Sequence, residues 1–148
     1  NLGLGRTKVT DAGGVHFRHC KDLTQLYLAE TAVTDAGLAV FKDRKGLFSV
    51  YLNKTGVTDT GLKQFANSGA LVYLGLDDTA VTDAGLKHLA GCTALAELEV
   101  GCPRVTGAGL DHLKGCAALH RLDLGNSGVT DANLARLKAL PKLATLSV

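Results

Sequence analysis

Apolar residues recur along the chain with a period of 24 residues. The clearest markers are six valines spaced by that period without an insertion, Val9, Val33, Val57, Val81, Val105 and Val129. Around each valine the text repeats as V-T-D-A-G-L or a close variant, and before it stands a phrase of the form L-x-x-L-x-L. A fixed period of about 20 to 50 residues is typical of proteins whose stacked units share one continuous core. The pattern therefore predicts a single domain over residues 1–148, with about six repeats that belong to a longer array or protein.

The two phrases of each repeat predict a strand followed by a short helix. In the first phrase apolar residues alternate with polar ones, as at Leu26 and Leu28, so their side chains point to one side of a strand. After V-T-D the apolar spacing becomes three, as at Leu38 and Phe41, which is one helical turn. Thr34 or Asp35 is the expected N-cap, because a short side-chain oxygen can accept the free amides of the first turn. The same role is expected at Asp59, Asp83 and Asp131, and the helices are expected to end at Gly46, Gly69, Gly91 and Gly115.

Stacking of the repeats is needed because one strand and one short helix cannot bury their apolar sides alone. Stacked repeats place the strands in a parallel sheet and the helices on the opposite face. Neighbouring helices need about 10 Å, whereas neighbouring strands need about 4.8 Å, so the stack must curve with the sheet inside. The predicted fold is an α/β right-handed solenoid, a horseshoe with a concave parallel sheet and short helices on its convex face.

The phrase L-x-x-L-x-L-x-x-T-x-V-T-D-A-G-L-x-x-L-x-x-C resembles the leucine-rich repeats over the whole chain. It is most similar to the cysteine-containing type and to the 24-residue repeats of bacterial, planctomycete-like proteins. The resemblance implies protein recognition through the concave strand surface. The chain departs from its own repeat pattern at Gly14, Gly107 and Asn133. The residues at the end of the strand phrase are Thr7, Thr31, Thr55, Thr79, Pro103 and Ser127. Their hydroxyl side chains are expected to form a hydrogen-bonded ladder along the turns, which Pro103 interrupts.

The outward strand positions form columns that are expected to carry the binding surface. The central column contains Gly3, Tyr27, Tyr51, Gly75, Glu99, Asp123 and Ser147. The column before it contains Asn1, Gln25, Ser49, Tyr73, Glu97, Arg121 and Thr145. All three tyrosines of the chain thus fall on neighbouring repeats, with Phe48 beside them. Tyrosine is enriched at interface hot spots, although its preference for strands is an alternative explanation.

A second part of the same face is acidic. Glu99 and Asp123 are adjacent in the central column, where like charges cost a sheet stability that a basic partner would restore. The candidate partner-binding residues are Tyr27, Phe48, Tyr51, Tyr73, Asp77, Glu99 and Asp123. The expected partner is a protein or peptide with a basic and partly apolar patch. Other charges are expected to pair with one another, along the column of Arg6, Glu30, Lys54 and Asp78 and between Glu97 and Arg121.

Several other classes of function receive no support from the sequence. The net charge is +2 and the strand phrases are mainly acidic, which disfavours nucleic acid. The apolar runs are too short to span a membrane. No nucleophile elbow or phosphate loop occurs, so we expect neither an enzyme nor a cofactor. His88, Asp111 and His112 are interpreted as a solvated helix surface rather than a metal or acid–base site.

The cysteines are interpreted as buried thiols rather than metal ligands. Cys20, Cys92 and Cys116 share a repeat position that is taken by Leu140 in the last repeat, so the position is apolar. Cys102 follows a strand and is expected to be exposed, with its reactivity open. Thiols without disulfide spacing weakly favour a reducing, cytoplasmic compartment.

Two further functions remain open from the sequence. The repeats are also compatible with an architectural segment, or with end-to-end self-association through the strands at both ends. The resemblance alone also allows the substrate-selecting part of an effector or of a ubiquitin-ligase adaptor.

Overall fold

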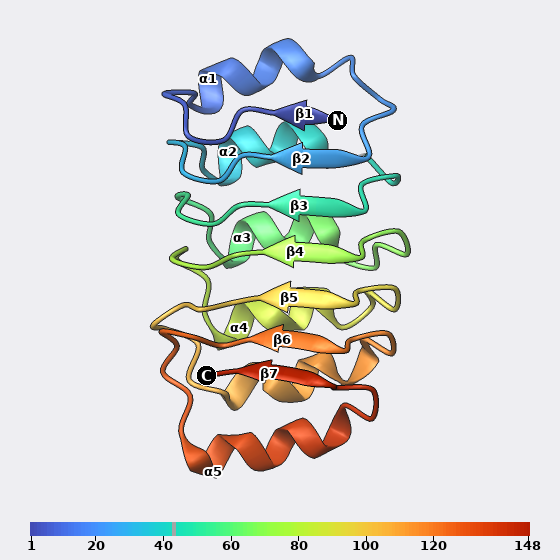
Figure 1. Ribbon diagram of the computed structural model, residues 1–148. Helices are drawn as coiled ribbons and strands as arrows, with labels where there is room; N and C mark the ends of the chain where they lie inside the picture. The colour runs from blue at the N-terminus through green and yellow to red at the C-terminus, as the bar shows by residue number, and fades with distance from the viewer. Residues whose placement is uncertain (43) are drawn as a thin grey trace.

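Seven short parallel strands form one layer of the molecule in the computed structural model, which describes residues 1–42 and 44–148. The strands pair in chain order (Figure 1). Each residue pairs with the residue 24 positions later, as in Leu26 with Val50 and Leu74 with Leu98. The strands are β1 (Leu2–Gly3), β2 (Gln25–Tyr27), β3 (Ser49–Tyr51), β4 (Tyr73–Gly75), β5 (Glu97–Glu99), β6 (Arg121–Asp123) and β7 (Thr145–Ser147).

The second layer consists of short helices, one after each of the first six strands. Most begin as an α-helical turn: α1 (Asp11–Gly14), α2 (Asp35–Leu38), α3 (Asp59–Leu62), α4 (Asp83–Leu86) and α5 (Asp131–Leu134). Each continues as a 3-10 turn: η1 (Val15–Phe17), η2 (Ala39–Phe41), η3 (Lys63–Phe65), η4 (Lys87–Leu89) and η6 (Ala135–Ala139). The fifth repeat has only a 3-10 helix, η5 (Ala108–Gly115). It differs because Gly107 replaces the aspartate that begins the other helices and adopts a left-handed φ of 96°.

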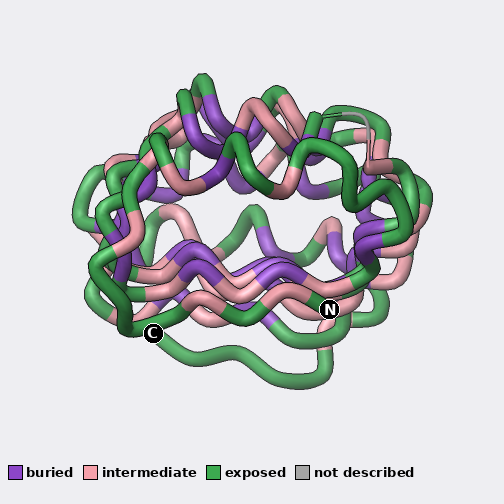
Figure 2. Tube along the Cα trace, turned by 90° about the horizontal axis from the view of Figure 1, so that it is seen from above, coloured by how far each residue is buried: buried purple, intermediate pink, exposed green. Residues whose placement is uncertain are grey.

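The sheet is the inner, concave side of a leucine-rich-repeat solenoid. In Figure 1, α1 lies beyond β1 and α5 lies beyond β7, so the helix layer is longer than the sheet. Figure 2, seen along the stack, shows the sheet and the helices on opposite sides of each coil, with the buried segments turned inward. The predicted fold is confirmed, and its curvature follows from the larger spacing that helices need.

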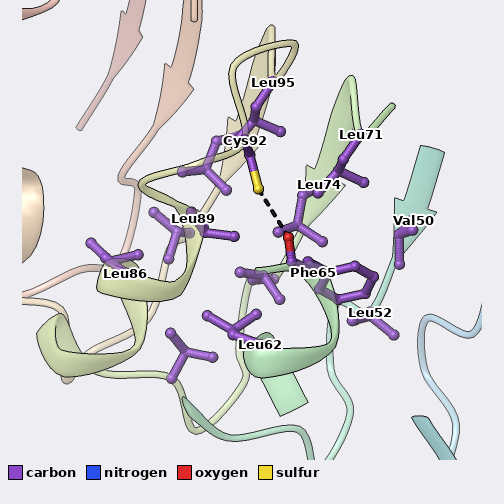
Figure 3. Packing of buried hydrophobic residues seen from close by; sticks show 14 of the residues in the cluster. Val50, Leu52, Leu62, Phe65, Leu71, Leu74, Leu86, Leu89, Cys92 and Leu95 are labelled. Atoms are coloured by element: carbon purple, nitrogen blue, oxygen red, sulfur yellow. Dashed lines mark hydrogen bonds between the residues drawn. The ribbon is translucent and has the colours of Figure 1, made fainter. Parts of the chain in front are cut away.

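Leucine side chains from both phrases meet between the sheet and the helices. Leu74 from β4 and Leu62 from α3 are completely buried, as are Leu86 and Leu89 of the next helix. Figure 3 shows this cluster together with Phe65 and Cys92. The apolar pairs predicted to share a helical face are therefore core residues, and the core continues from repeat to repeat.

Threonine, not aspartate, is the N-cap of the helices. The Thr34 hydroxyl accepts a hydrogen bond from the Ala36 amide at 3.3 Å. Equivalent bonds at 3.2 Å are made at Thr58 and Thr82. The aspartates predicted as caps therefore lie one residue inside the helix, and their carboxylates have a different role.

The aspartates that begin α1 to α4 each link their repeat to the following one. The Asp35 carboxylate accepts hydrogen bonds from the amide and the hydroxyl of Thr58, at 2.8 and 2.6 Å. The same pair of bonds joins Asp11 to Thr34, Asp59 to Thr82 and Asp83 to Thr106. We call this series the Asp–Thr ladder. It stops at the fifth repeat, where Gly107 supplies no carboxylate and the Thr130 hydroxyl instead donates to Asn133.

The ladder expected at the strand ends is not formed. The hydroxyls of Thr31, Thr55 and Thr79 donate to the carbonyl three residues earlier in the same repeat, at 2.6–2.7 Å. The residue before each of these threonines has a left-handed φ of 55° or 57°, at Glu30, Lys54 and Asp78. The tight turn brings each hydroxyl back to its own strand, so the bond stays within the repeat.

Two of the predictions on cysteines are wrong. Cys92 and Cys116 are buried as expected, and their thiols donate to the carbonyls of Phe65 and Leu89 in the preceding repeat. Cys20 is exposed, because it lies in the first repeat and no earlier repeat of the described chain packs on it. Cys102 is fully buried and donates to the Leu76 carbonyl at 3.1 Å. The next residue is Pro103, and a residue before proline is held away from helical conformations. Cys102 therefore does not adopt the left-handed φ of the equivalent residues Glu30, Lys54 and Asp78.

The four glycines predicted to end the helices do not act as left-handed caps. Among the described glycines, only Gly107 has a positive φ. Gly91 and Gly115 instead allow a close approach between repeats, because an added Cβ would clash with Asn67 and with the Ala90 carbonyl, respectively. No atom lies within 4 Å of a Cβ added at Gly46 or Gly69, so neither position requires glycine for space.

Candidate binding surface

The three tyrosines of the chain form one continuous stack on the concave face. The rings of Tyr27 and Tyr51 are 4.5 Å apart between centroids and inclined by 13°. Those of Tyr51 and Tyr73 are 4.4 Å apart and inclined by 33°. All three are partly exposed, whereas the alternate strand residues Leu26, Val50 and Leu74 are completely buried. The tyrosines therefore face outward from the sheet, as the alternation predicted.

Tyr73 reaches this stack from the neighbouring column because Gly75 leaves the central position empty. Gly75 pairs with Tyr51 in the register between β3 and β4. A Cβ added at Gly75 would lie 2.9 Å from the Tyr73 hydroxyl and would clash with the Asn53 side-chain oxygen. The space above Gly75 is thus shared by the side chains of Tyr73 and Asn53. Gly75 was placed in the central column by the sequence, but its effect on Tyr73 was not predicted.

Three carboxylates continue the surface beyond the tyrosines. Asp77 accepts a hydrogen bond from the Gly101 amide at 2.7 Å, and Asp123 accepts one from the Gly125 amide at 2.9 Å. Glu99 accepts one from the Asn53 side-chain amide at 3.0 Å. Glu99 also pairs in register with Asp123, so the two like charges lie on adjacent strands as predicted.

The electrostatic environment of this region is strongly acidic. Burial raises the pKa of Asp77, and the nearby carboxylates of Glu99, Asp123 and Asp78 raise it further. Burial also raises the pKa of the Tyr73 hydroxyl, and the nearby negative charge of Glu99 contributes. Both raised pKa values mean that the negatively charged forms of these side chains are unfavourable here. A bound cation would stabilise the charged forms and lower both pKa values.

An apolar edge borders the tyrosines at the start of the strands. Phe48 and Val72 occupy the same repeat position, just before β3 and β4, and each is 39% exposed. Exposed large apolar side chains in adjacent repeats are typical of interaction surfaces. Phe48 was a predicted site residue, whereas Val72 was missed, although its repeat position next to Phe48 pointed to it.

The structure thus brings the predicted residues together on one face. We define the concave surface by its apolar edge, its tyrosine stack and its acidic half: Phe48, Val72, Tyr27, Tyr51, Tyr73, Asn53, Asp77, Glu99 and Asp123. Asn53 was missed because a polar residue just after a strand is common and has no periodic signal. Its contact with Glu99 joins β3 to β5 across two repeats, which no local pattern could predict.

Several of the expected charge pairs do not form among the described residues. Arg6 pairs with Glu30 at 3.0 Å, but neither Lys54 with Asp78 nor Glu97 with Arg121 forms an ion pair there. Asp111 contacts Lys114 at 2.8 Å and also pairs with Arg136, so it belongs to an exposed helix surface. Within the described ranges, no cluster of three or more His, Cys, Asp or Glu side chains is arranged to hold a metal ion.

The buried thiols are not suited to nucleophilic chemistry. Burial raises the pKa of Cys92 and Cys102, and it raises the pKa of Cys116 to about 12. Because the thiolate is the reactive form, these cysteines are structural rather than reactive.

The described helices include none that is long and apolar enough to cross a membrane.

Comparison with known proteins identifies the class of fold. A leucine-rich-repeat protein, an internalin from Listeria monocytogenes, superimposes on 99% of this chain with a TM-score of 0.63 and 20% sequence identity. The chain spans 53% of the length of that internalin. The match supports the leucine-rich-repeat solenoid read from the repeats and the sheet. No model of a protein family matches the chain, and no curated protein sequence matches it either.

Proposed function

We propose that this solenoid is a non-enzymatic recognition module that binds a protein or peptide across its concave sheet. The observation that carries the proposal is the tyrosine stack, which presents three aromatic side chains on adjacent strands without burying them in the core. Tyrosine offers a large contact area and loses little conformational entropy on binding. The similarity to an internalin supports a scaffold of this kind but says nothing of the partner.

The surface favours a partner that is basic on one side and apolar on the other. Phe48 and Val72 supply an exposed apolar edge at the strand starts, and Asp77, Glu99 and Asp123 supply negative charge near the strand ends. Covering the like-charged carboxylates with a partner that brings no positive charge is unfavourable. A basic partner is therefore favoured both by apolar contact with the edge and by attraction to the carboxylates. The negative charge disfavours nucleic acid on this face.

The double substitution Tyr27→Ala and Tyr51→Ala is expected to reduce partner binding more than tenfold. Hot-spot tyrosines each contribute about 2 kcal/mol or more, and 1.4 kcal/mol already corresponds to about tenfold in affinity. The measurement is capture from a lysate of the cells in which the protein occurs, with retained proteins quantified by mass spectrometry. Circular dichroism of the variant checks that the solenoid remains folded.

The matched control is Lys63→Ala with Lys87→Ala, two exposed residues on the opposite, convex face. This variant is expected to retain the same proteins as the wild type. If the tyrosine variant also retains them, the concave-face assignment is wrong. The repeats would then be an architectural or self-associating segment, which the sequence also allows.

A further inference from the structure

The acidic half of the concave surface consists mainly of hydrogen-bond acceptors. Asp77, Glu99 and Asp123 each use one carboxylate oxygen for a hydrogen bond within the chain. The second oxygen of Asp77 and that of Asp123 accept no hydrogen bond from the described residues. These oxygens are free to accept from a donor on a partner. A partner that carries hydrogen-bond donors would therefore complement this half of the surface.

A further unpaired acceptor lies at the border between the acidic half and the tyrosines. The side-chain oxygen of Asn53 is buried and has no hydrogen-bond partner among the described residues. It lies directly above Gly75, next to the Tyr73 hydroxyl. Because this oxygen is enclosed by the neighbouring side chains, it is not itself a contact for a partner. The amide group of the same side chain donates to Glu99 at 3.0 Å and so holds that carboxylate at the border with the tyrosines.

The aromatic side of the same border can also hold a positive charge. Tyr73 stacks on Tyr51, and its hydroxyl lies over Gly75 beside the Asn53 side chain, so both contacts fix the position of its ring. The ring is partly exposed. A guanidinium group can stack on such a ring while its N–H groups point outward from the ring edge.

We propose that the concave surface binds an arginine side chain of its partner between the ring of Tyr73 and the carboxylates of Asp77, Glu99 and Asp123. This inference rests on the proposed function and specifies its partner. Arginine fits better than lysine because its planar guanidinium carries five donors for several acceptors and also stacks on a ring. Lysine offers a compact charge with three donors and no planar face.

The apolar edge adds a second element to the recognised segment. Val72 lies just before β4 and Gly75 is the last residue of β4, so the two are three residues apart, or about 10 Å in extended chain. An extended peptide that lies along the strands covers this distance with about three residues. The recognised segment therefore carries an aromatic or aliphatic residue about three positions from the arginine.

The test is selection of phage-displayed random peptides on the immobilised protein. The wild type is expected to enrich peptides with an arginine and an apolar residue about three positions apart. A synthetic peptide of the enriched sequence is expected to bind at least tenfold more weakly after its arginine is exchanged for lysine. The variant Asp77→Asn, Glu99→Gln and Asp123→Asn is expected to bind it at least tenfold more weakly than the wild type.

The control variant removes the same number of charges elsewhere, by Asp22→Asn, Glu30→Gln and Asp131→Asn. It is expected to bind the peptide like the wild type, which separates local contacts from the overall charge. Circular dichroism verifies that each variant is folded. If the triple variant is unfolded, the peptide affinity is measured on the single variant Asp123→Asn instead. Enriched peptides without a basic residue, or with lysine as often as arginine, would overturn the arginine site and leave the concave face intact. Enrichment that persists on the Tyr27→Ala, Tyr51→Ala variant would overturn the proposed function itself.

Discussion

Asp83→Ala is expected to lower the free energy of unfolding by about 3 kcal/mol. The Asp83 carboxylate accepts four hydrogen bonds from the next repeat, from the amide and hydroxyl of Thr106 and from the amides of Gly107 and Gly109. Bonds to a charged group contribute about 1.5–3 kcal/mol each, but they are not additive and partial exposure weakens them. Urea denaturation followed by circular dichroism measures the change.

Asp131→Ala is the matched control, since Asp131 holds the same repeat position in α5. It is exposed, and within the described part of the chain its carboxylate accepts no hydrogen bond from another repeat. The expected loss is below about 1 kcal/mol. Equal losses for the two variants would show that the Asp–Thr ladder adds nothing beyond the charge at the helix start.

The same ladder gives the stability a defined dependence on pH. Partial burial raises the pKa of Asp83, but the hydrogen bonds from Thr106, Gly109 and Gly107 outweigh it and the net pKa lies below the ordinary value of 3.8. The pKa of Asp11 is lowered in the same way through Thr34 and Gly37. This stability is present above the unfolded-state pKa and is lost as the pH falls through the lower folded-state pKa. The difference between wild type and Asp83→Ala should therefore shrink below pH 3.8.

Gly109→Ala is expected to destabilise the protein by about 2–3 kcal/mol. A Cβ at this position would lie 2.5 Å from the Asp83 carbonyl oxygen and 2.8 Å from the Asp83 Cα. These are backbone atoms of the preceding repeat, which cannot rotate away, so the two repeats must separate. Thermal unfolding of the purified variant measures the effect.

Gly69→Ala is the control for the general cost of replacing glycine. No atom lies within 4 Å of a Cβ added there, and Gly69 is not among the residues with positive φ. The change should be neutral or slightly stabilising, because alanine restricts the unfolded chain. A Gly109→Ala protein as stable as Gly69→Ala would contradict the tight packing between the fourth and fifth repeats.

The fold could be predicted because every repeat gives the same local signal at the same spacing. Alternation at Leu26 and Leu28 and the three-residue spacing of Leu38 and Phe41 both appear as expected in the core. The contacts that join one repeat to the next could not be read in the same way. Asp35 matched the rule for a helix cap, yet its carboxylate bonds to Thr58 of the following repeat. Only the stacked structure shows which of two adjacent polar residues has which role.

The arrangement of the candidate surface was predicted in part for the same reason. Columns of outward residues follow from the repeat, so the tyrosines and the pair Glu99 and Asp123 were placed correctly on one face. The movement of Tyr73 across the empty position at Gly75 depends on two columns together. Likewise, Asn53 reaches Glu99 across an intervening strand. Side-chain directions of this kind are set by the packing of several strands, not by the spacing within one.

The most direct test of the concave-face account is a titration followed by tyrosine fluorescence. The chain has no tryptophan and its three tyrosines form the concave stack, so the emission reports on this surface. The ligand is a selected peptide without aromatic residues, and calorimetry measures its affinity independently. A peptide bound to the concave face is expected to cause a saturable change in tyrosine emission, with the same Kd as that from calorimetry. Binding detected by calorimetry without any change in tyrosine emission would contradict this expectation, because the peptide would then occupy another face.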